Sequence, residues 1–227
     1  MARTLNPEVY AVRREAFLDA AQTLIQTRGY LQMSVADVLD ALGVSKGAFY
    51  HYFESKDVLL DAVVERMADQ AAERLAPMLS DPARSAVDKL EALFGGMAAF
   101  KAERKDLVLG ILQVWLSDDN AIVREKMRRL VASRLVPWLD GIVRQGIAEG
   151  AFSSRYPDEL ARVLAALIQG MSELASELWV GRQLGTLTFL EVSRTFDAYG
   201  EAFERIVGVA PGALTFIDQP TLQFWFG

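Results

Sequence analysis

The sequence has no cysteine, a single histidine and no apolar run approaching the length of a membrane-spanning helix. The missing cysteine excludes disulfides, thiolate metal sites and thiol catalysis. The lone His51 leaves little material for a catalytic triad or a histidine-ligated metal. A membrane span needs about 20 apolar residues, and residues 1–10 lack the apolar stretch of a secretory signal. We therefore expect a cytoplasmic protein that is not an enzyme and has no cofactor.

Alternating strand patterns are almost absent, and acidic residues outnumber basic ones. The chain carries 30 aspartates and glutamates against 24 lysines and arginines, a net charge of −6, and residues 1–60 are acidic as well. Because phosphates attract cations, this balance counts against a nucleic-acid partner. Any such interaction must depend on where the cations lie.

Helical periodicity, in contrast, runs nearly from end to end, and 52% of the residues are apolar. The pattern predicts an all-α fold of about nine helices. The expected helices cover residues 7–28, a short segment after Ser34, 45–53, 55–79, 84–104, 105–117, 119–149, 157–183 and 188–209. Pro137 should kink or divide the helix that contains it. Residues 210–227 look irregular, although the apolar end at 224–226 should dock on the protomer, on a partner or in a pocket.

Residues 34–53 have the layout of a helix-turn-helix. Ser34 suits an N-cap, with Asp37 at the capping-box position, and Gly43 breaks the short helix that follows. Two such short helices cannot fold alone, so the helix over residues 7–28 must supply the surface beneath them.

The second of these short helices begins with small and polar residues and ends with aromatic ones. Small residues allow a helix to approach a groove closely, and Lys46 can reach a phosphate or a guanine edge. Tyr50 and His51 can donate hydrogen bonds to phosphates, while Phe49 and Phe53 point inward. Without further context, aromatics in this pattern indicate core packing.

The run from Ser34 to Leu60, Ser-Val-Ala-Asp-Val-Leu-Asp-Ala-Leu-Gly-Val-Ser-Lys-Gly-Ala-Phe-Tyr-His-Tyr-Phe-Glu-Ser-Lys-Asp-Val-Leu-Leu, resembles the helix-turn-helix signature of the TetR family of transcriptional regulators. The residues at 20–21 and 29–30 agree too, so the close resemblance covers about residues 13–63. It implies a helix-turn-helix domain over 1–55, a helical effector-binding and dimerisation domain over 56–209, and a tail over 210–227.

The resemblance also implies which residues contact DNA. The third helix would enter the major groove, and Arg3 would follow the backbone or enter a minor groove. The predicted contacts are Ser45, Lys46, Gly47 and Ala48 near the bases, and Ser34, Tyr50, His51 and Lys56 at phosphates.

Members of this family commonly bind a small effector between their middle helices and dimerise through their last two long helices. The predicted effector residues are Phe94, Met97, Phe100, Leu112, Trp115, Trp138 and Met171. The predicted dimer residues lie on two heptad-like seams: Leu164, Leu167, Met171, Leu178, Phe196, Tyr199 and Phe203. For both sets the alternative is packing in the protomer's own core.

The resulting functional hypothesis is a homodimeric repressor that binds a pseudo-palindromic double-stranded operator and leaves it when an unidentified small molecule binds. A dimer makes physical sense because two recognition helices read two half-sites. The alternative is a helical ligand-binding or adaptor protein without DNA binding, and the acidic balance is its best support.

Overall fold

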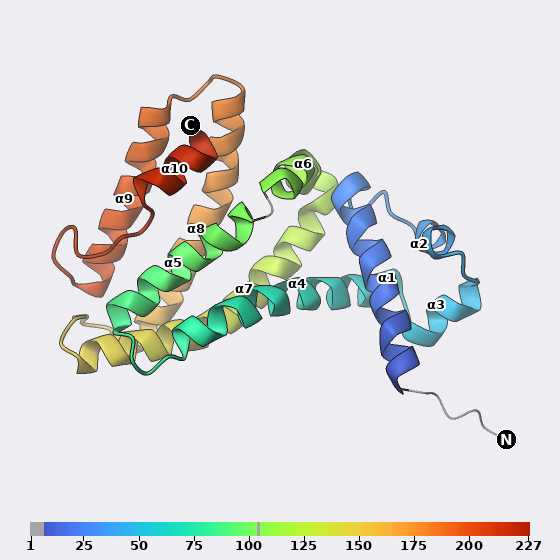
Figure 1. The fold of residues 1–227 in the computed structure, drawn as a ribbon, viewed down its shortest axis with the longest axis horizontal. Helices are drawn as coiled ribbons and strands as arrows, with labels where there is room; N and C mark the ends of the chain where they lie inside the picture. The colour runs from blue at the N-terminus through green and yellow to red at the C-terminus, as the bar shows by residue number, and fades with distance from the viewer. Residues whose placement is uncertain (1–6, 104) are drawn as a thin grey trace. The chain divides into compact units, whose positions relative to one another are not determined.

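The computed structural model describes residues 7–103 and 105–227, and within them the chain is helical without a single strand (Figure 1). The all-α prediction is confirmed, with one α-helix more than expected. The elements are α1 (Pro7–Arg28), α2 (Val35–Leu42), α3 (Lys46–Tyr52), α4 (Lys56–Leu79), α5 (Ala86–Ala102), α6 (Lys105–Leu116), the 3-10 helix η1 (Asp118–Asn120), α7 (Ala121–Ala148), α8 (Pro157–Gln183), α9 (Phe189–Val207) and α10 (Gln219–Phe226).

The chain forms two compact units that differ from the predicted division at residue 55. The N-terminal unit comprises residues 1–70 and 105–130, and the C-terminal unit comprises residues 71–104 and 131–227. The difference has a physical cause, because side chains from α6 and the start of α7 share a hydrophobic core with α1 to α4. Both α4 and α7 contribute residues to each unit.

The core of the N-terminal unit joins the helix-turn-helix to α1. The rings of Phe17, Phe49 and Phe53 are buried with centroids 5.9 to 6.0 Å apart, so α1 is the surface on which α3 packs. The predicted capping box at Ser34 is present, and Gly43 ends α2 in the left-handed conformation with φ of 63°. Glycine adopts that conformation without a steric penalty, which explains the tight turn.

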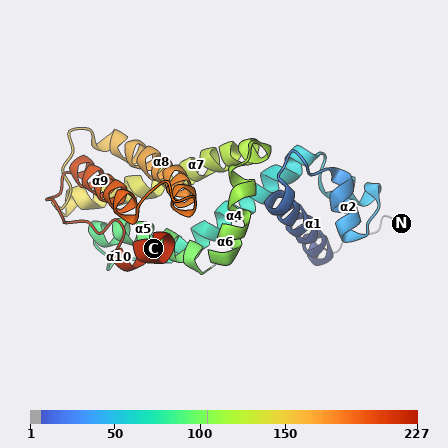
Figure 2. The same cartoon turned by 90° about the horizontal axis from the view of Figure 1, so that it is seen from above.

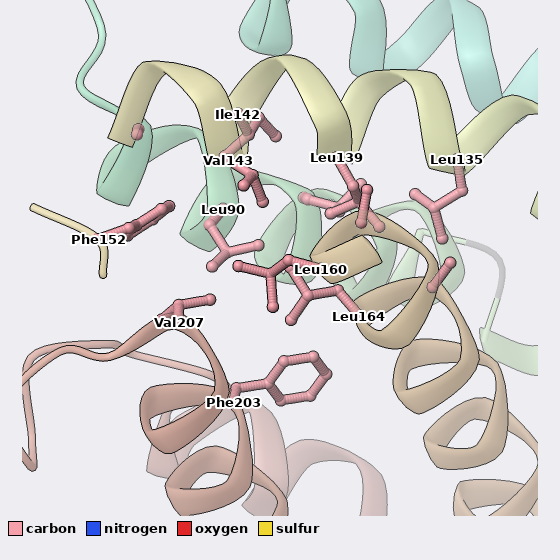
Figure 3. Close-up of a cluster of buried hydrophobic side chains, with 14 of the residues drawn as sticks. Leu90, Leu135, Leu139, Ile142, Val143, Phe152, Leu160, Leu164, Phe203 and Val207 are labelled. Atoms are coloured by element: carbon pink, nitrogen blue, oxygen red, sulfur yellow. The ribbon is translucent and has the colours of Figure 1, made fainter. Parts of the chain in front are cut away.

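The core of the C-terminal unit gathers leucine, valine and phenylalanine side chains from α5, α7, α8 and α9 (Figure 3). Leu90, Leu139, Leu164 and Phe203 point toward one another in its centre, and each is at least 98% buried. Helices α8 and α9 contact each other directly and run side by side (Figures 1 and 2).

The expectation of an irregular tail is wrong for residues 219–226, which form α10. The Asp218 carboxylate accepts a hydrogen bond from the Thr221 N–H at 2.8 Å and caps the helix, and Pro220 occupies its first turn, where proline is tolerated. Leu222 and Phe226 are buried against α8 and α9. Of the three destinations left open for the aromatic end, the structure has it docked on its own protomer.

Pro137 does not divide its helix, because α7 continues unbroken from Ala121 to Ala148. A proline removes one backbone hydrogen bond, and the remaining bonds of a helix this long keep it continuous. Among the described helices, α8 is long and apolar enough to cross a membrane by composition, and only 22% of its most apolar window is buried here.

Candidate nucleic-acid interface

Helix α3 divides into a buried and an exposed set of residues, as its sequence predicts. Phe49 and Phe53 lie in the core. Ser45, which precedes the first turn, and Lys46 and Gly47 within it are exposed, and Ala48 is half-buried. Tyr50 is 51% exposed and His51 is exposed as well. The structure thus brings the predicted base-contacting residues together at the N-terminal end of one exposed helix.

Gly47 is not required by the fold. Its φ lies outside the left-handed region, and a Cβ atom built there would meet no neighbouring atom closer than 4.0 Å, the distance to Ser45 Oγ. A glycine in the interior of a helix costs roughly 0.5 to 1 kcal/mol relative to alanine, and in the first turn it costs up to that amount. Helix α3 is therefore less stable than it would be with alanine at this exposed position, although no other described residue occupies the space. Close approach of another molecule to this backbone is a physical reason for such a choice.

Aromatic neighbours hold the outer side chains of α3. The His51 ring packs edge-on against Tyr10 and Tyr52, with centroids 5.8 and 5.0 Å away. Lys46 Nζ lies 5.9 Å from the centre of the Tyr50 ring, near the outer limit of a cation–π contact. The His51 imidazole is therefore positioned by packing, whereas the Lys46 side chain can still extend outward.

The predicted phosphate contact at Ser34 shares its hydroxyl with the capping box. Ser34 Oγ accepts a hydrogen bond from the Asp37 N–H at 3.2 Å, and its O–H donates to the Asp37 carboxylate. Hydrogen bonds from Ser34 hold the pKa of Asp37 below its usual value, with a smaller effect of Arg28. A phosphate at Ser34 must compete with this carboxylate for the hydroxyl hydrogen.

Lys56 opens α4 beside a buried tyrosine. Its Nζ lies 4.1 Å from the centre of the Tyr30 ring, within cation–π distance. Burial lowers the pKa of Lys56, and the neighbouring carboxylates of Asp57 and Asp37 oppose that shift. The cation stands at the N-terminus of a long helix, where backbone N–H groups also favour anions.

Several carboxylates around the helix-turn-helix are ion-paired. Arg66 binds both Glu15 and Asp19, at 3.0 and 2.7 Å, and Arg28 lies 3.4 Å from Asp37. Lys126 pairs with Asp61. Ion pairs near the surface contribute little stability, and these pairs place a cation beside each of the four carboxylates.

The structure adds a residue that the sequence analysis missed. Arg13 of α1 lines a hollow of about 390 Å³ together with the predicted DNA contacts Ala48 and His51. Tyr10, Arg13 and Phe17 follow a helical spacing of three and four, so they share one face of α1. That spacing was the signal available in the sequence.

The predicted effector residues are dispersed. Phe94, Met97 and Trp138 border the main core of the C-terminal unit, whereas Met171 belongs to the cluster around α10. Leu112 and Trp115 lie in the N-terminal unit, where Leu112 is buried and Trp115 borders the core. The side chain of Phe100, like Arg3, lies outside the described part of the chain.

A groove of about 480 Å³ opens in the C-terminal unit between α7 and α8, and none of the predicted effector residues lines it. Its lining consists of Ala132, Ser133, Val136, Pro137, Arg162, Ala165, Ala166 and Gln169.

The predicted dimer residues are largely covered inside one protomer. Leu164 and Phe203 lie in the main core, Leu167 and Tyr199 border it, and the others form the cluster against α10: Met171, Leu178 and Phe196. Five of the seven thus pack inside the protomer, while Leu167 and Tyr199 stay partly exposed. The physical reason is that α8 and α9 pack their apolar stripes on α5, α7, α10 and each other.

Comparison with known proteins agrees with this geometry. Residues 17–63 match the family described as bacterial regulatory proteins, tetR family. The HTH-type transcriptional repressor KstR2 of Mycolicibacterium smegmatis (strain ATCC 700084 / mc(2)155) is 33% identical over 155 residues, covering 65% of this chain and 71% of the relative. KstR2 of Rhodococcus jostii (strain RHA1) is 27% identical over 159 residues, covering 66% and 72%.

A solved TetR transcription regulator from Haloarcula marismortui ATCC 43049 shares the fold, with a TM-score of 0.59, 17% identity and coverage of 87% of this chain and 97% of that one. These relatives are regulators rather than enzymes, and they give no support to the adaptor alternative. With its exposed α3 on an α1 support, the chain belongs to the TetR family and is a DNA-binding transcriptional regulator.

Proposed function

We propose that the protein is a cytoplasmic repressor that binds a pseudo-palindromic operator as a homodimer and is released from it by a small-molecule effector. It acts by binding and has no catalytic step. We propose repression rather than activation because two relatives are named as repressors. The lone histidine, His51, has its place on the exposed side of α3 rather than in an enclosed site.

The observation that carries the proposal is the exposed glycine at position 47. A stable helix would prefer alanine there, and the protein leaves room for it. The backbone of α3 can therefore approach the floor of a major groove more closely than a helix with a side chain at this point. Lys46, the neighbouring cation, then contacts a base edge or a phosphate.

Around this point the remaining residues position the helix on the duplex. Tyr50 and His51 donate hydrogen bonds to phosphates on one side, and Lys56 binds a phosphate at the start of α4. We add Arg13 to this set because it shares a hollow with Ala48 and His51. With few long side chains near the bases, part of the specificity comes from DNA shape.

The dimer would form through the outward side of α8 rather than through the buried seams. Val163 is 47% exposed. Ala166 lies three residues later, on the same side of the helix, and is exposed as well. Small apolar side chains allow two helices to pack closely, and a two-fold interface repeats the same patch on both copies. A partner would also cover the α8 surface that is left unburied in the single protomer.

Release by an effector requires that the small molecule bind the DNA-competent and incompetent conformations with different affinities. We propose that it binds among the middle helices, using Phe94, Met97 and Trp138, which border a single core. A change there would alter the position of α4, whose first residue is Lys56. The spacing between the two recognition helices would then no longer match the half-sites.

Selection from a random pool of double-stranded DNA tests the proposal. We expect enrichment of a two-fold symmetric site with half-sites about one helical turn apart, and binding that weakens steeply with salt. The complex is then exposed to a panel of small molecules, one of which should release the DNA. Absence of any sequence-preferring, salt-sensitive binding would instead favour the adaptor alternative.

A further inference from the structure

Tyr30 stands between a lysine and the aspartate that follows it in the chain. The ring of Tyr30 faces the ammonium group of Lys56, with Nζ 4.1 Å from the ring centre. Its hydroxyl donates a hydrogen bond to Oδ1 of Asp57. One side chain, only 4% exposed, therefore contacts the cation through its face and the carboxylate through its end.

The backbone of Tyr30 is fixed by a buried asparagine. Its N–H donates to Asn120 Oδ1 at 2.8 Å, and Asn120 is completely buried. Asn120 Nδ2 in turn donates to the carbonyl oxygens of Ile25 and Val114, at 3.2 and 3.1 Å. These bonds join the end of α1, the end of α6 and η1 within the N-terminal unit, so Tyr30 cannot shift without breaking them.

This arrangement matters because Lys56 has two carboxylates within electrostatic reach, Asp57 and Asp37. A lysine ammonium is a point charge on a flexible stem and can turn toward either of them. With the Tyr30 hydroxyl on Oδ1 of Asp57 and the ring beneath Nζ, one oxygen of the carboxylate is already hydrogen-bonded and the ammonium has an aromatic face to rest on. The lysine is thereby held ready for a phosphate.

We propose that Tyr30 is a positioning residue for DNA binding, which keeps Lys56 from pairing with Asp57 and presents its charge to the DNA backbone. The inference rests on the proposed phosphate contact of Lys56. Tyr30 itself is too deeply buried to contact the duplex, so its effect on affinity must pass through Lys56.

The test measures the dissociation constant for a selected duplex, and its salt dependence, in a set of full-length variants. Lys56→Ala should weaken binding to all sequences alike. It should also reduce the slope of the logarithm of the binding constant against the logarithm of the salt concentration by about one. Tyr30→Phe keeps the ring and removes the hydroxyl. It should weaken binding about three-fold, which is only part of the loss that Lys56→Ala causes. The double variant should bind no more weakly than Lys56→Ala alone.

A second substitution that restores DNA affinity distinguishes a positioning role of Tyr30 from a merely structural one. Asp57→Asn removes the carboxylate that would capture Lys56, so adding it to Tyr30→Phe should restore affinity, which a loss of folding would not allow. Tyr156→Phe, at an exposed tyrosine of the C-terminal unit, is the matched control and should bind like the wild type. Thermal unfolding confirms that each variant is folded at the assay temperature.

Three outcomes would overturn the inference. If Lys56→Ala weakens binding while Tyr30→Phe does not, or if their effects simply multiply, Tyr30 does not act through Lys56. If Lys56→Ala binds as tightly as the wild type, the proposed phosphate contact is itself wrong and the role of Tyr30 is lost with it.

Discussion

Lys46 is the single lysine or arginine in α3, and its side chain is exposed at the start of that helix. We expect Lys46→Ala to weaken operator binding about ten-fold, because one contact to a base edge or phosphate is removed. The midpoint of thermal unfolding should stay nearly constant, since an exposed substitution changes stability by less than about 0.5 kcal/mol. Fluorescence anisotropy with a labelled duplex measures the affinity.

The control for that experiment is Arg194→Ala, which removes one exposed positive charge from α9. If Lys46→Ala and Arg194→Ala change the affinity by the same small factor, overall charge accounts for the effect and Lys46 lies outside the interface.

Tyr30 gives a second prediction at this scale, on pH dependence. Burial, followed by the hydrogen bond donated to Asp57, raises the pKa of Tyr30 well above its ordinary value. The folded state therefore retains the phenol proton that the unfolded chain loses near pH 10. The stability contributed by Tyr30 is present in full below about pH 10 and is lost as pH rises beyond it.

Unfolding by urea checks this sign when wild type and Tyr30→Phe are compared. Near neutral pH we expect the wild type to be more stable by about 1 kcal/mol, the usual contribution of a hydrogen bond. Above about pH 10 the advantage should shrink, because the variant has no phenol at this position to ionise. A difference that is constant across the range would contradict the protonated, donating state of Tyr30.

At the scale of single elements, α10 depends on packing rather than on helix propensity. A helix of eight residues is not stable in isolation, so the buried Leu222 and Phe226 must hold it in place. Arg182 adds a hydrogen bond from Nε to the Phe226 carbonyl oxygen at 2.9 Å. Loss of the packing should therefore release the whole element.

Two phenylalanines in the same helix provide a matched pair for this prediction. Phe226, 6% exposed, should cost about 3 kcal/mol or more when changed to alanine, as buried aromatic truncations do. Phe224→Ala, at 47% exposure, should cost far less. Scanning calorimetry of both variants measures the change, and equal losses would mean that α10 is not docked through Phe226.

The elements also show what the sequence could and could not predict. The bounds of α1 and α8, the capping box at Ser34 and the end of α2 at Gly43 follow from local signals and are confirmed. Helix α10 was missed because a short turn, a proline and a cap do not by themselves indicate a helix. Its stability comes from side chains that are distant in the sequence. A local pattern does not encode such contacts.

The same distinction applies to the candidate site. The residues of α3 could be placed because Phe49 and Phe53, four residues apart, share the inward side and the resemblance to the TetR signature assigns the outward residues. The seams of α8 and α9 could not, because periodicity identifies an apolar face without showing what covers it. Leu164 and Phe203 lie on correctly predicted faces, yet their neighbours belong to the same protomer.

At the scale of the whole molecule, we expect a dimer formed through the outward side of α8. Val163→Glu would place a charge at the centre of that patch, and two copies would bring two such charges together across the two-fold axis. We expect the variant to sediment as a monomer at concentrations where the wild type is a dimer. Operator affinity should fall as well, because a monomer reads only one half-site.

Ile147→Glu, at another partly exposed apolar residue of the C-terminal unit, is the control and should remain dimeric. If Val163→Glu sediments with the wild type, this side of α8 is not the interface. The selected DNA site would then still reveal, by its symmetry, whether two copies bind.

The most direct test of the central claim combines two readouts on Gly47→Ala. The added methyl group should raise the midpoint of thermal unfolding, since alanine favours the helix over glycine by up to about 1 kcal/mol. At the same time it should weaken binding to the selected duplex. A variant that is more stable and binds the duplex as tightly as the wild type would contradict the placement of α3 in the groove.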